Sequence, residues 1–293
     1  MKRVFFVLAS ARSGTLYLRD LFHKNIQNCA SRHEPFFDWG NPTLFGPAIY
    51  DAHAERLDRI RERLSRKRAY VERLREEIYL ESSHAFLKSI YVAGLEFFPE
   101  MRLIHLVRNP LYVAKSEARR QEYRERFHAP FHFYVGDDGR RHFCWALTGN
   151  EDIFRHFAHE RLSLFQWYLL QWIEIENRAM RFLDQHQLHD RCFMLHTPRD
   201  LNDAEKVREM FAFFELPTAQ PAIVLGGRTN KSIGLKTVIT PADERECDEL
   251  LERVPRSYLE IFEREPYRKL GWSARLRRGG NLDELQNVEM KRQ

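Results

Sequence analysis

The residues best suited to chemistry lie in a short turn near the start of the chain, residues 10–15 (Ser-Ala-Arg-Ser-Gly-Thr). The turn follows an apolar run, residues 4–9, and precedes leucines at helical spacing, so it joins a predicted strand to a predicted helix. At such a junction the unpaired N–H groups and the helix dipole attract an anion such as phosphate. Arg12 can grip phosphate oxygens, Gly14 permits close backbone approach, and Thr15 can cap the helix. A tight turn with a surface arginine explains the same residues equally well.

A second turn of this kind begins at Arg108, directly after the apolar run 102–107. Pro110 opens the following helix, and Ser116 lies on that helix, where its hydroxyl could meet the same anion as Arg108. An ordinary helix start with a capping asparagine would explain Asn109 and Pro110, but it would not explain an arginine at the end of a strand.

Strand-like and helix-like patterns alternate along most of the chain. This alternation predicts an α/β fold, in which a parallel sheet is flanked by helices on both faces and ligands bind beyond the carboxyl ends of the strands. The predicted strands are 4–9, 78–81, 102–107 and 192–196. Two predicted helices start at residues 16 and 110. The other predicted helices cover 51–78 (as one or two helices), 86–98, 161–187 and 203–215.

Residues 128–160 interrupt the alternation. An aromatic run, a Gly-Asp-Asp-Gly turn and a second aromatic run predict an inserted β-hairpin over 131–145, and inserted loops commonly carry specificity. The hairpin could present its aromatic faces to an acceptor, or it could simply pack on itself. These aromatic residues are Phe131, Phe133, Tyr134, Phe143 and Trp145. The five histidines of the segment match no compact zinc-ligand spacing, and aromatic packing explains them better.

The composition is that of a globular protein, with 43% hydrophobic and 13% aromatic residues. Four widely spaced cysteines favour a reducing compartment, the cytoplasm, over a disulfide framework. No uncharged apolar stretch approaches the roughly 20 residues that cross a bilayer. A net charge of +5 suits an anionic ligand but is weak evidence for nucleic acid. The basic run 59–68 is expected to be a solvated helix face, residues 1–272 one domain, and residues 273–293 a polar tail.

Taken together, the two turns resemble those of the PAPS-dependent sulfotransferases. In that family a 5′-phosphosulfate loop follows the first strand, and a 3′-phosphate motif has Arg-Asn/Asp-Pro with a serine eight residues after the arginine. Ser116 follows Arg108 by eight residues here, since 116 − 108 = 8. The resemblance extends through residues 80–84, the Trp-rich helix, residues 227–231 and residues 270–272.

The resemblance implies a P-loop sulfotransferase-like fold that binds 3′-phosphoadenosine 5′-phosphosulfate (PAPS) as the sulfuryl donor and needs no metal. The family motif maps the 5′-phosphate onto Arg12, Ser13, Gly14 and Thr15, the 3′-phosphate onto Arg108 and Ser116, and late contacts onto Arg228, Asn230 and Lys231. The acceptor would be a hydroxyl on a carbohydrate, a lipid-linked compound or another small molecule.

The acceptor hydroxyl must lose a proton, and two residues compete for the role of base. Glu34 resembles the glutamate base of carbohydrate and tyrosylprotein sulfotransferases, and His84 resembles the histidine base of the cytosolic small-molecule enzymes. Glu34 is the favoured candidate, because a carboxylate beside Arg12 can be held ionised and oriented.

Two other functions remain open from the sequence. A P-loop phosphotransferase is disfavoured because the Walker pattern GxxxxGKS/T is absent. A non-enzymatic module that binds polyanions is suggested only by the basic run 59–68, and it would show strongly salt-dependent binding.

Overall fold

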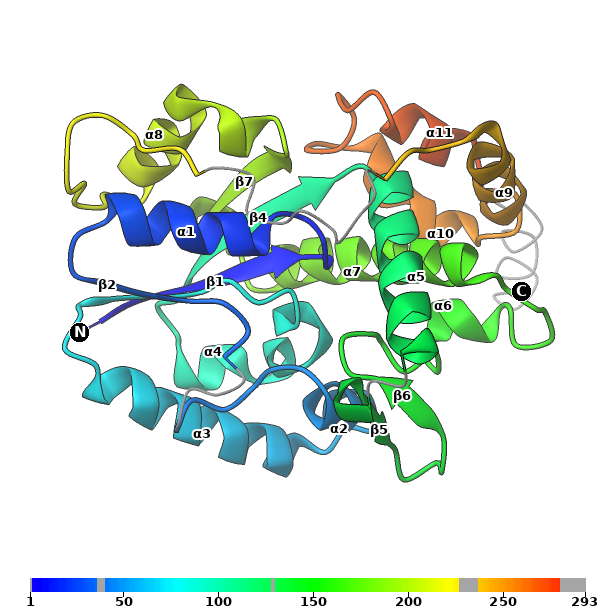
Figure 1. Cartoon of the computed structure of the whole chain (residues 1–293), viewed down its shortest axis with the longest axis horizontal. Coiled ribbons are helices and arrows are strands. Elements are labelled where there is room, and N and C mark those ends of the chain that lie inside the picture. Colours follow the sequence, from blue (N-terminus) through cyan, green and yellow to red (C-terminus); the bar gives the residue numbers. More distant parts are fainter. Residues whose placement is uncertain (1, 36–39, 128–129, 227–236, 280–293) are drawn as a thin grey trace, which may run out of the picture.

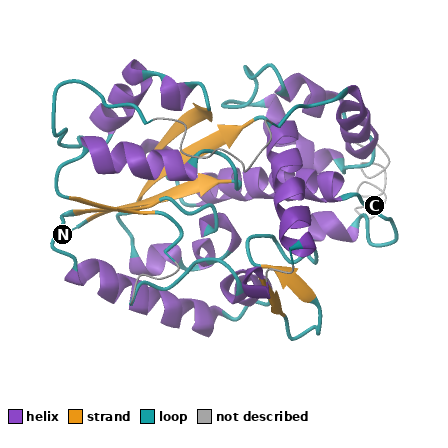
Figure 2. Ribbon diagram, in the orientation of Figure 1, coloured by secondary structure: helices purple, strands orange, loops and turns teal. Residues whose placement is uncertain are grey.

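A parallel five-stranded sheet forms the centre of the computed structural model, which describes residues 2–35, 40–127, 130–226 and 237–279. The strand order is β2-β3-β1-β4-β7, and every neighbouring pair is parallel. The strands are β1 (Arg3–Ala9), β2 (Cys29–Arg32), β3 (Ile78–Glu81), β4 (Arg102–Arg108) and β7 (Cys192–Thr197). Helices lie on both faces of this sheet (Figures 1 and 2), so the predicted fold class is confirmed.

The two faces of the sheet bury different side chains of the same strands, because successive residues of a strand point to opposite sides. In β1, Phe5 and Val7 pack toward α1 (Thr15–Asn25) and α8 (Ala204–Phe213), whereas Phe6 and Leu8 belong to the larger core on the other face. Both faces are therefore apolar, and the chemistry is left to the edge where the strands end.

The larger core is built around α7 (Leu164–Gln185), which is buried on nearly all sides, as its apolar composition predicts. Its start is fixed by a capping box between Ser163 and Gln166. The other helices that contribute residues to this core are α2 (Pro47–His53), α3 (Leu57–Arg73), α4 (Gly94–Phe97), α5 (Pro110–Arg126), α6 (Asp152–Arg155), α9 (Pro241–Leu251), α10 (Arg256–Leu259) and α11 (Ser273–Arg278).

Two expected elements differ in the structure. The stretch 51–78 contains the end of α2 and all of α3, and Ile78 belongs to strand β3 rather than to a helical stripe. The expected helix 86–98 is broken into the 3₁₀ helices η1 (Phe86–Lys88) and η2 (Ile90–Val92), followed by α4. At the break the Ser89 hydroxyl donates to the carbonyl of Ala85, a local bond that competes with regular helix.

The end of the described chain is folded rather than frayed. Residues 273–278 form α11, in which Ser273 and Leu276 are buried, so the packed part of the protein extends past residue 272. Of the helices in the described ranges, none has both the length and the apolar character needed to cross a bilayer.

Candidate active site

Four of the turns singled out from the sequence meet at the carboxyl edge of the sheet. Because β2, β3, β1 and β4 are neighbours in that order, the residues that follow them lie in the same order along the edge. Glu34 follows β2, His84 follows β3, Arg12 follows β1, and Arg108 ends β4. The predicted site residues of these turns are therefore gathered at one edge.

The two predicted anion-binding turns touch each other. The Nε atom of Arg12 donates a 2.9 Å hydrogen bond to the hydroxyl of Ser116 on α5. Arg108 donates from Nη1 to the backbone carbonyl of Arg12. Arg12 has a φ of 63°, a left-handed conformation that costs a non-glycine residue energy and that recurs at functional sites.

The start of α1 leaves its first N–H groups available to a ligand. The N-cap residue is Gly14 rather than Thr15, and no side chain caps the helix. Gly14 has a φ of 97°, and a Cβ there would lie 2.8 Å from Leu201 Cδ1, so both the conformation and the space require glycine. Gly14 thus permits the close approach of Leu201, which lies in the 3₁₀ helix η5 (Asp200–Asn202).

Buried groups in these turns fit an anionic ligand such as a nucleotide phosphate. The Ser13 hydroxyl is buried and has no hydrogen-bond partner among the described residues. Burial lowers the pKa of Arg12 and of Arg108, and each is lowered further by a neighbouring guanidinium, that of Arg120 and that of Arg12 respectively. Partly buried cations that lie close together repel one another, so a bound anion that compensates their charge stabilises the cluster.

Glu34 and His84, which the sequence presented as rivals, form one pair. Oε1 of Glu34 lies 3.0 Å from Nε2 of His84, and their side chains are 14% and 3% exposed. Burial opposes ionisation of Glu34, but His84, His33 and Arg120 outweigh it and lower the pKa of this carboxyl. Burial, followed by the charge of Lys88, lowers the pKa of His84 to about 4, so the ring is neutral near pH 7.

Two residues of the site, Lys88 and Arg120, were not predicted from the sequence. Lys88 is buried, and its Nζ lies 3.2 Å from Nδ1 of His84. Arg120 lies 4.7 Å over the ring of Trp145 and pairs with Glu117 at 2.7 Å. The available signal was spacing, because each stands four residues after a predicted site residue, His84 and Ser116 respectively.

The inserted hairpin exists as predicted, and its aromatic residues range from buried to exposed. Strand β5 (Phe133–Val135) pairs antiparallel with β6 (Arg141–Phe143). Phe143 is 4% exposed and belongs to the main core, whereas Phe131 is 84% exposed. His142 contacts Asp138 at 3.2 Å, and the His132 ring lies 5.0 Å from that of Trp145. The described chain contains no cluster of three or more residues able to hold a metal ion.

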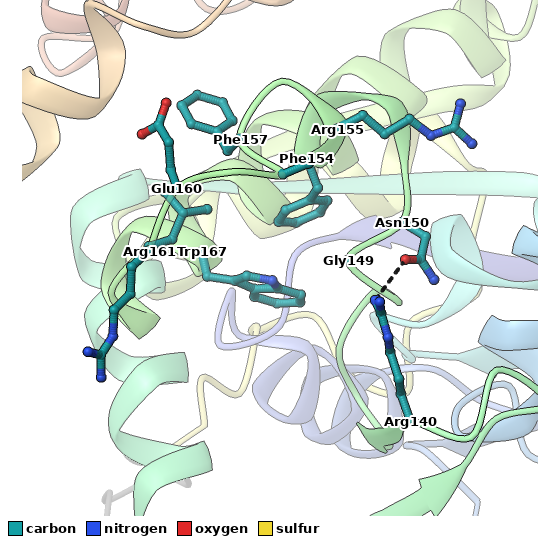
Figure 3. Close-up of a pocket in the computed structure, with 11 residues that line it drawn as sticks. Arg140, Gly149, Asn150, Phe154, Arg155, Phe157, Glu160, Arg161 and Trp167 are labelled. Atoms are coloured by element: carbon teal, nitrogen blue, oxygen red, sulfur yellow. Dashed lines mark hydrogen bonds between the residues drawn. The ribbon is translucent and has the colours of Figure 1, made fainter.

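A cavity of about 740 Å³ lies between the insertion and the start of α7. The rings of Trp167 and Phe154 stack within it at 4.9 Å. In Figure 3 Arg140 reaches up to Asn150 beside these rings, whereas the side chains of Arg155 and Arg161 extend away from them on opposite sides. The lining thus combines aromatic faces with positive charge, and most of it comes from the segment 128–160 that was expected to face the acceptor.

The remaining predicted residues have other outcomes. Arg228, Asn230 and Lys231 lie outside the described residues. Within the basic run 59–68, Arg61 pairs with Glu96 at 2.8 Å on the surface. Lys67, in contrast, is fully buried against Glu81 at 2.5 Å, so the run is only partly a solvated face.

Comparison with known proteins gives a likeness in structure alone. Neither a family model nor a curated protein sequence matches the chain. A sulfotransferase from Alicyclobacillus acidocaldarius matches with 16% identity and a TM-score of 0.49, over 92% of this chain and 100% of that one. A sulfotransferase domain from the curacin biosynthetic pathway matches with 15% identity and a TM-score of 0.44, over 85% and 98%. At these values the likeness concerns the path of the chain and assigns no activity.

Proposed function

We propose that the protein is a PAPS-dependent sulfotransferase that moves a sulfuryl group to a hydroxyl of a carbohydrate, lipid-linked or other small-molecule acceptor. The observation that carries this proposal is the contact between Arg12 and Ser116. It joins the two turns that would bind the 5′- and 3′-phosphate groups of one nucleotide. Arg12 is also near enough to Glu34 to interact with it electrostatically, so the anion site and the base pair share one edge.

The donor PAPS would supply the sulfuryl group, and this chain offers groups that fit both of its ends. Arg12, the buried Ser13 hydroxyl and the uncapped start of α1 suit the 5′-phosphosulfate. Arg108 and Ser116 suit the 3′-phosphate. Sulfuryl carries less negative charge than phosphoryl, so guanidiniums and backbone amides can stabilise its transfer without a bridging metal ion.

The proton of the acceptor would pass to the Glu34–His84 pair. Arg120 is one of the charges that lower the pKa of Glu34. An anion bound beside Arg120 would offset that charge and raise the pKa of the carboxyl, which makes it a better proton acceptor when the donor is present. The base and the donor site are therefore coupled through one arginine.

The cavity beside the insertion supports a small-molecule or saccharide acceptor that carries negative charge. Trp167 and Phe154 offer aromatic surface on which a sugar or an apolar ring can stack, and the arginines around them suit an acidic substituent. The carbonyl of Trp145 accepts a hydrogen bond from Lys88 in the active site, and Gly149 lines the cavity. Since four residues of chain span at most about 14 Å, Trp145 and Gly149 lie within that distance of each other.

The cellular setting we propose is the cytoplasm. All four cysteines are free, and burial raises the pKa of each thiol to about 12, which keeps them unreactive.

Thermal unfolding in the presence of nucleotides tests the proposed function. Adenosine 3′,5′-bisphosphate at about 100 times its Kd should stabilise the protein by about 2.7 kcal/mol, because a ligand that binds only the native state raises the free energy of unfolding. ATP with Mg²⁺ at the same concentration should stabilise it much less. Stabilisation by ATP-Mg²⁺ alone would favour a phosphotransferase, and no stabilisation by the bisphosphate would refute the sulfotransferase.

A further inference from the structure

Lys88 is a buried amine placed against the proposed base pair. Its side chain is 1% exposed and ends η1, four residues after His84. Nζ lies 3.2 Å from Nδ1 of His84 and donates a 2.5 Å hydrogen bond to the carbonyl of Trp145. Burying an amine is costly unless its protons are bonded, and here both observed contacts are made to groups of the active site and the insertion.

The chemistry of the two partners fixes which ring nitrogen of His84 carries the proton. In its ammonium form Lys88 has only N–H donors and no acceptor, so Nδ1 of His84 must then accept. A neutral imidazole has one N–H, which then lies on Nε2, the atom that faces Oε1 of Glu34 at 3.0 Å. Nε2 is buried and makes no aligned hydrogen bond among the described residues, so its 3.0 Å approach to Oε1 of Glu34 is a close polar contact. His84 therefore presents a proton to Glu34 and has no free lone pair with which to take one.

We propose that Lys88 is a positioning residue that holds His84 in its Nε2–H tautomer, so that Glu34 is the base that accepts the proton of the acceptor hydroxyl. This inference rests on the proposed function. The acceptor O–H bond breaks and its proton moves to the Glu34 carboxylate. The acceptor oxygen bonds to sulfur, and the bond from sulfur to the phosphate oxygen of the donor breaks, with its electron pair leaving on the bisphosphate.

The charges around this chain of contacts come from several elements. Burial, more than any neighbouring charge, lowers the pKa of Lys88 to about 7, so the amine is an ammonium that can only donate at pH values below this. The groups that face Lys88, His84 and Glu34 are His33 after β2, Glu117 and Arg120 on α5, and Arg178 on α7. None of them contacts Nδ1 of His84 in the hydrogen bonds of the described residues, so Lys88 is the group that acts on this nitrogen, while the Glu34 carboxylate favours a proton on Nε2.

The tautomer can be measured directly, whatever the enzyme does. Nitrogen-15 NMR of the labelled native protein should show His84 protonated on Nε2 between pH 5 and 6, where Lys88 is an ammonium and His84 is neutral, and the Lys88→Met variant should show a larger share protonated on Nδ1. Protonation on Nδ1 in the native protein would overturn the proposal. This readout needs no donor or acceptor, so a failure of the proposed function leaves it interpretable.

Kinetics then separate the two candidate bases. His84→Gln keeps an N–H near the position of Nε2 and should retain turnover within about tenfold, whereas Glu34→Gln should lose about 10²-fold or more. Equal losses in the two variants would overturn the proposal. Bisphosphate binding should be unchanged in both, and its absence in the native protein would instead refute the proposed function.

Lys88 itself is tested by paired variants. Lys88→Met removes the donor and should lower kcat by about two- to tenfold at unchanged bisphosphate affinity, while Lys88→Gln, which can still donate, should recover most of that loss. In a His84→Gln background Lys88→Met should have little further effect, because the residue acts through the ring. An unchanged kcat in Lys88→Met, or full additivity with His84→Gln, would overturn the positioning role. If Lys88→Met does not fold, Lys88→Gln and the native NMR spectrum still decide.

Discussion

Ser116 contributes a neutral hydroxyl to the anion site, whereas Arg108 contributes a charge, and their removal should differ accordingly. Arg108→Ala should weaken binding of adenosine 3′,5′-bisphosphate by about 10- to 100-fold, since a hydrogen bond to a charged group is worth about 1.5–3 kcal/mol. Ser116→Ala should weaken it by about 2- to 10-fold. Isothermal titration calorimetry measures both.

Arg119 supplies a matched control on the same helix. It is exposed, so Arg119→Ala removes the same charge from α5 without touching the site and should leave the affinity nearly unchanged. If Arg108→Ala and Ser116→Ala bind the bisphosphate like the native protein, the 3′-phosphate assignment is wrong.

The sequence allows several site residues to be selected, but it does not predict which of them contact each other. Arg12, Glu34, His84 and Arg108 could be selected because each follows a recognisable strand. That Glu34 and His84 touch could not be foreseen, because the contact depends on β3 entering the sheet between β1 and β2. The order of strands is a property of the folded chain, and two turns 50 residues apart in sequence become neighbours only through it.

At the scale of elements, the turn between β1 and α1 depends on Gly14. Gly14→Ala places a Cβ against Leu201 and forces a φ of 97° on an L-residue, so we expect a loss of stability of about 1–3 kcal/mol and a weaker bisphosphate affinity. Chemical denaturation and calorimetry measure the two effects. Gly46→Ala is a useful comparison, because its φ is 70° while nothing lies within 4 Å of the added Cβ. Equal losses in both variants would mean that the contact with Leu201 is unimportant.

The hairpin should divide into a structural and an acceptor-facing part. Phe143→Ala should destabilise the fold by about 3–5 kcal/mol, because it empties a buried aromatic position. Phe131→Ala should leave stability nearly unchanged and raise the acceptor KM, since its ring is exposed. Thermal denaturation with steady-state kinetics distinguishes the two. An unchanged KM in Phe131→Ala would make the hairpin a scaffold and would move specificity elsewhere.

Elements with a strong period were predicted well, and weakly patterned ones were not. The apolar runs of β1 and β4 and the capped helix α7 agree with the prediction within a few residues. The segment 86–98 carries enough apolar residues for a helix, but its short 3₁₀ pieces are held by burial against α7 and the sheet, which local sequence does not encode.

For the whole molecule, the buried His84 predicts how stability changes with pH. Its folded pKa of about 4 lies below the unfolded value of about 6.5, so the native state binds fewer protons between these values. The free energy of unfolding should therefore fall as the pH is lowered through this window, by at most about 3 kcal/mol for this group. Glu34, whose folded pKa is also lowered, adds a loss in the same direction below the unfolded value of about 4.3.

His84→Gln should flatten this dependence between pH 6.5 and 4 in urea denaturation. His23 is exposed at the end of α1, so His23→Gln should keep the native slope. A slope that is the same in all three proteins would show that His84 becomes protonated without cost in the folded state.

Adjacent strands of a sheet stand about 4.8 Å apart, and β1 and β4 each end in one of the two cationic turns. The spacing of the turns is set by the backbone ladder between those strands, which side-chain substitutions leave intact. This edge of the sheet therefore selects ligands by the distance between their two negative groups. A compound that carries the same total charge on a single group can bind to only one of the two turns. The arginine of the other turn then has no counter-charge.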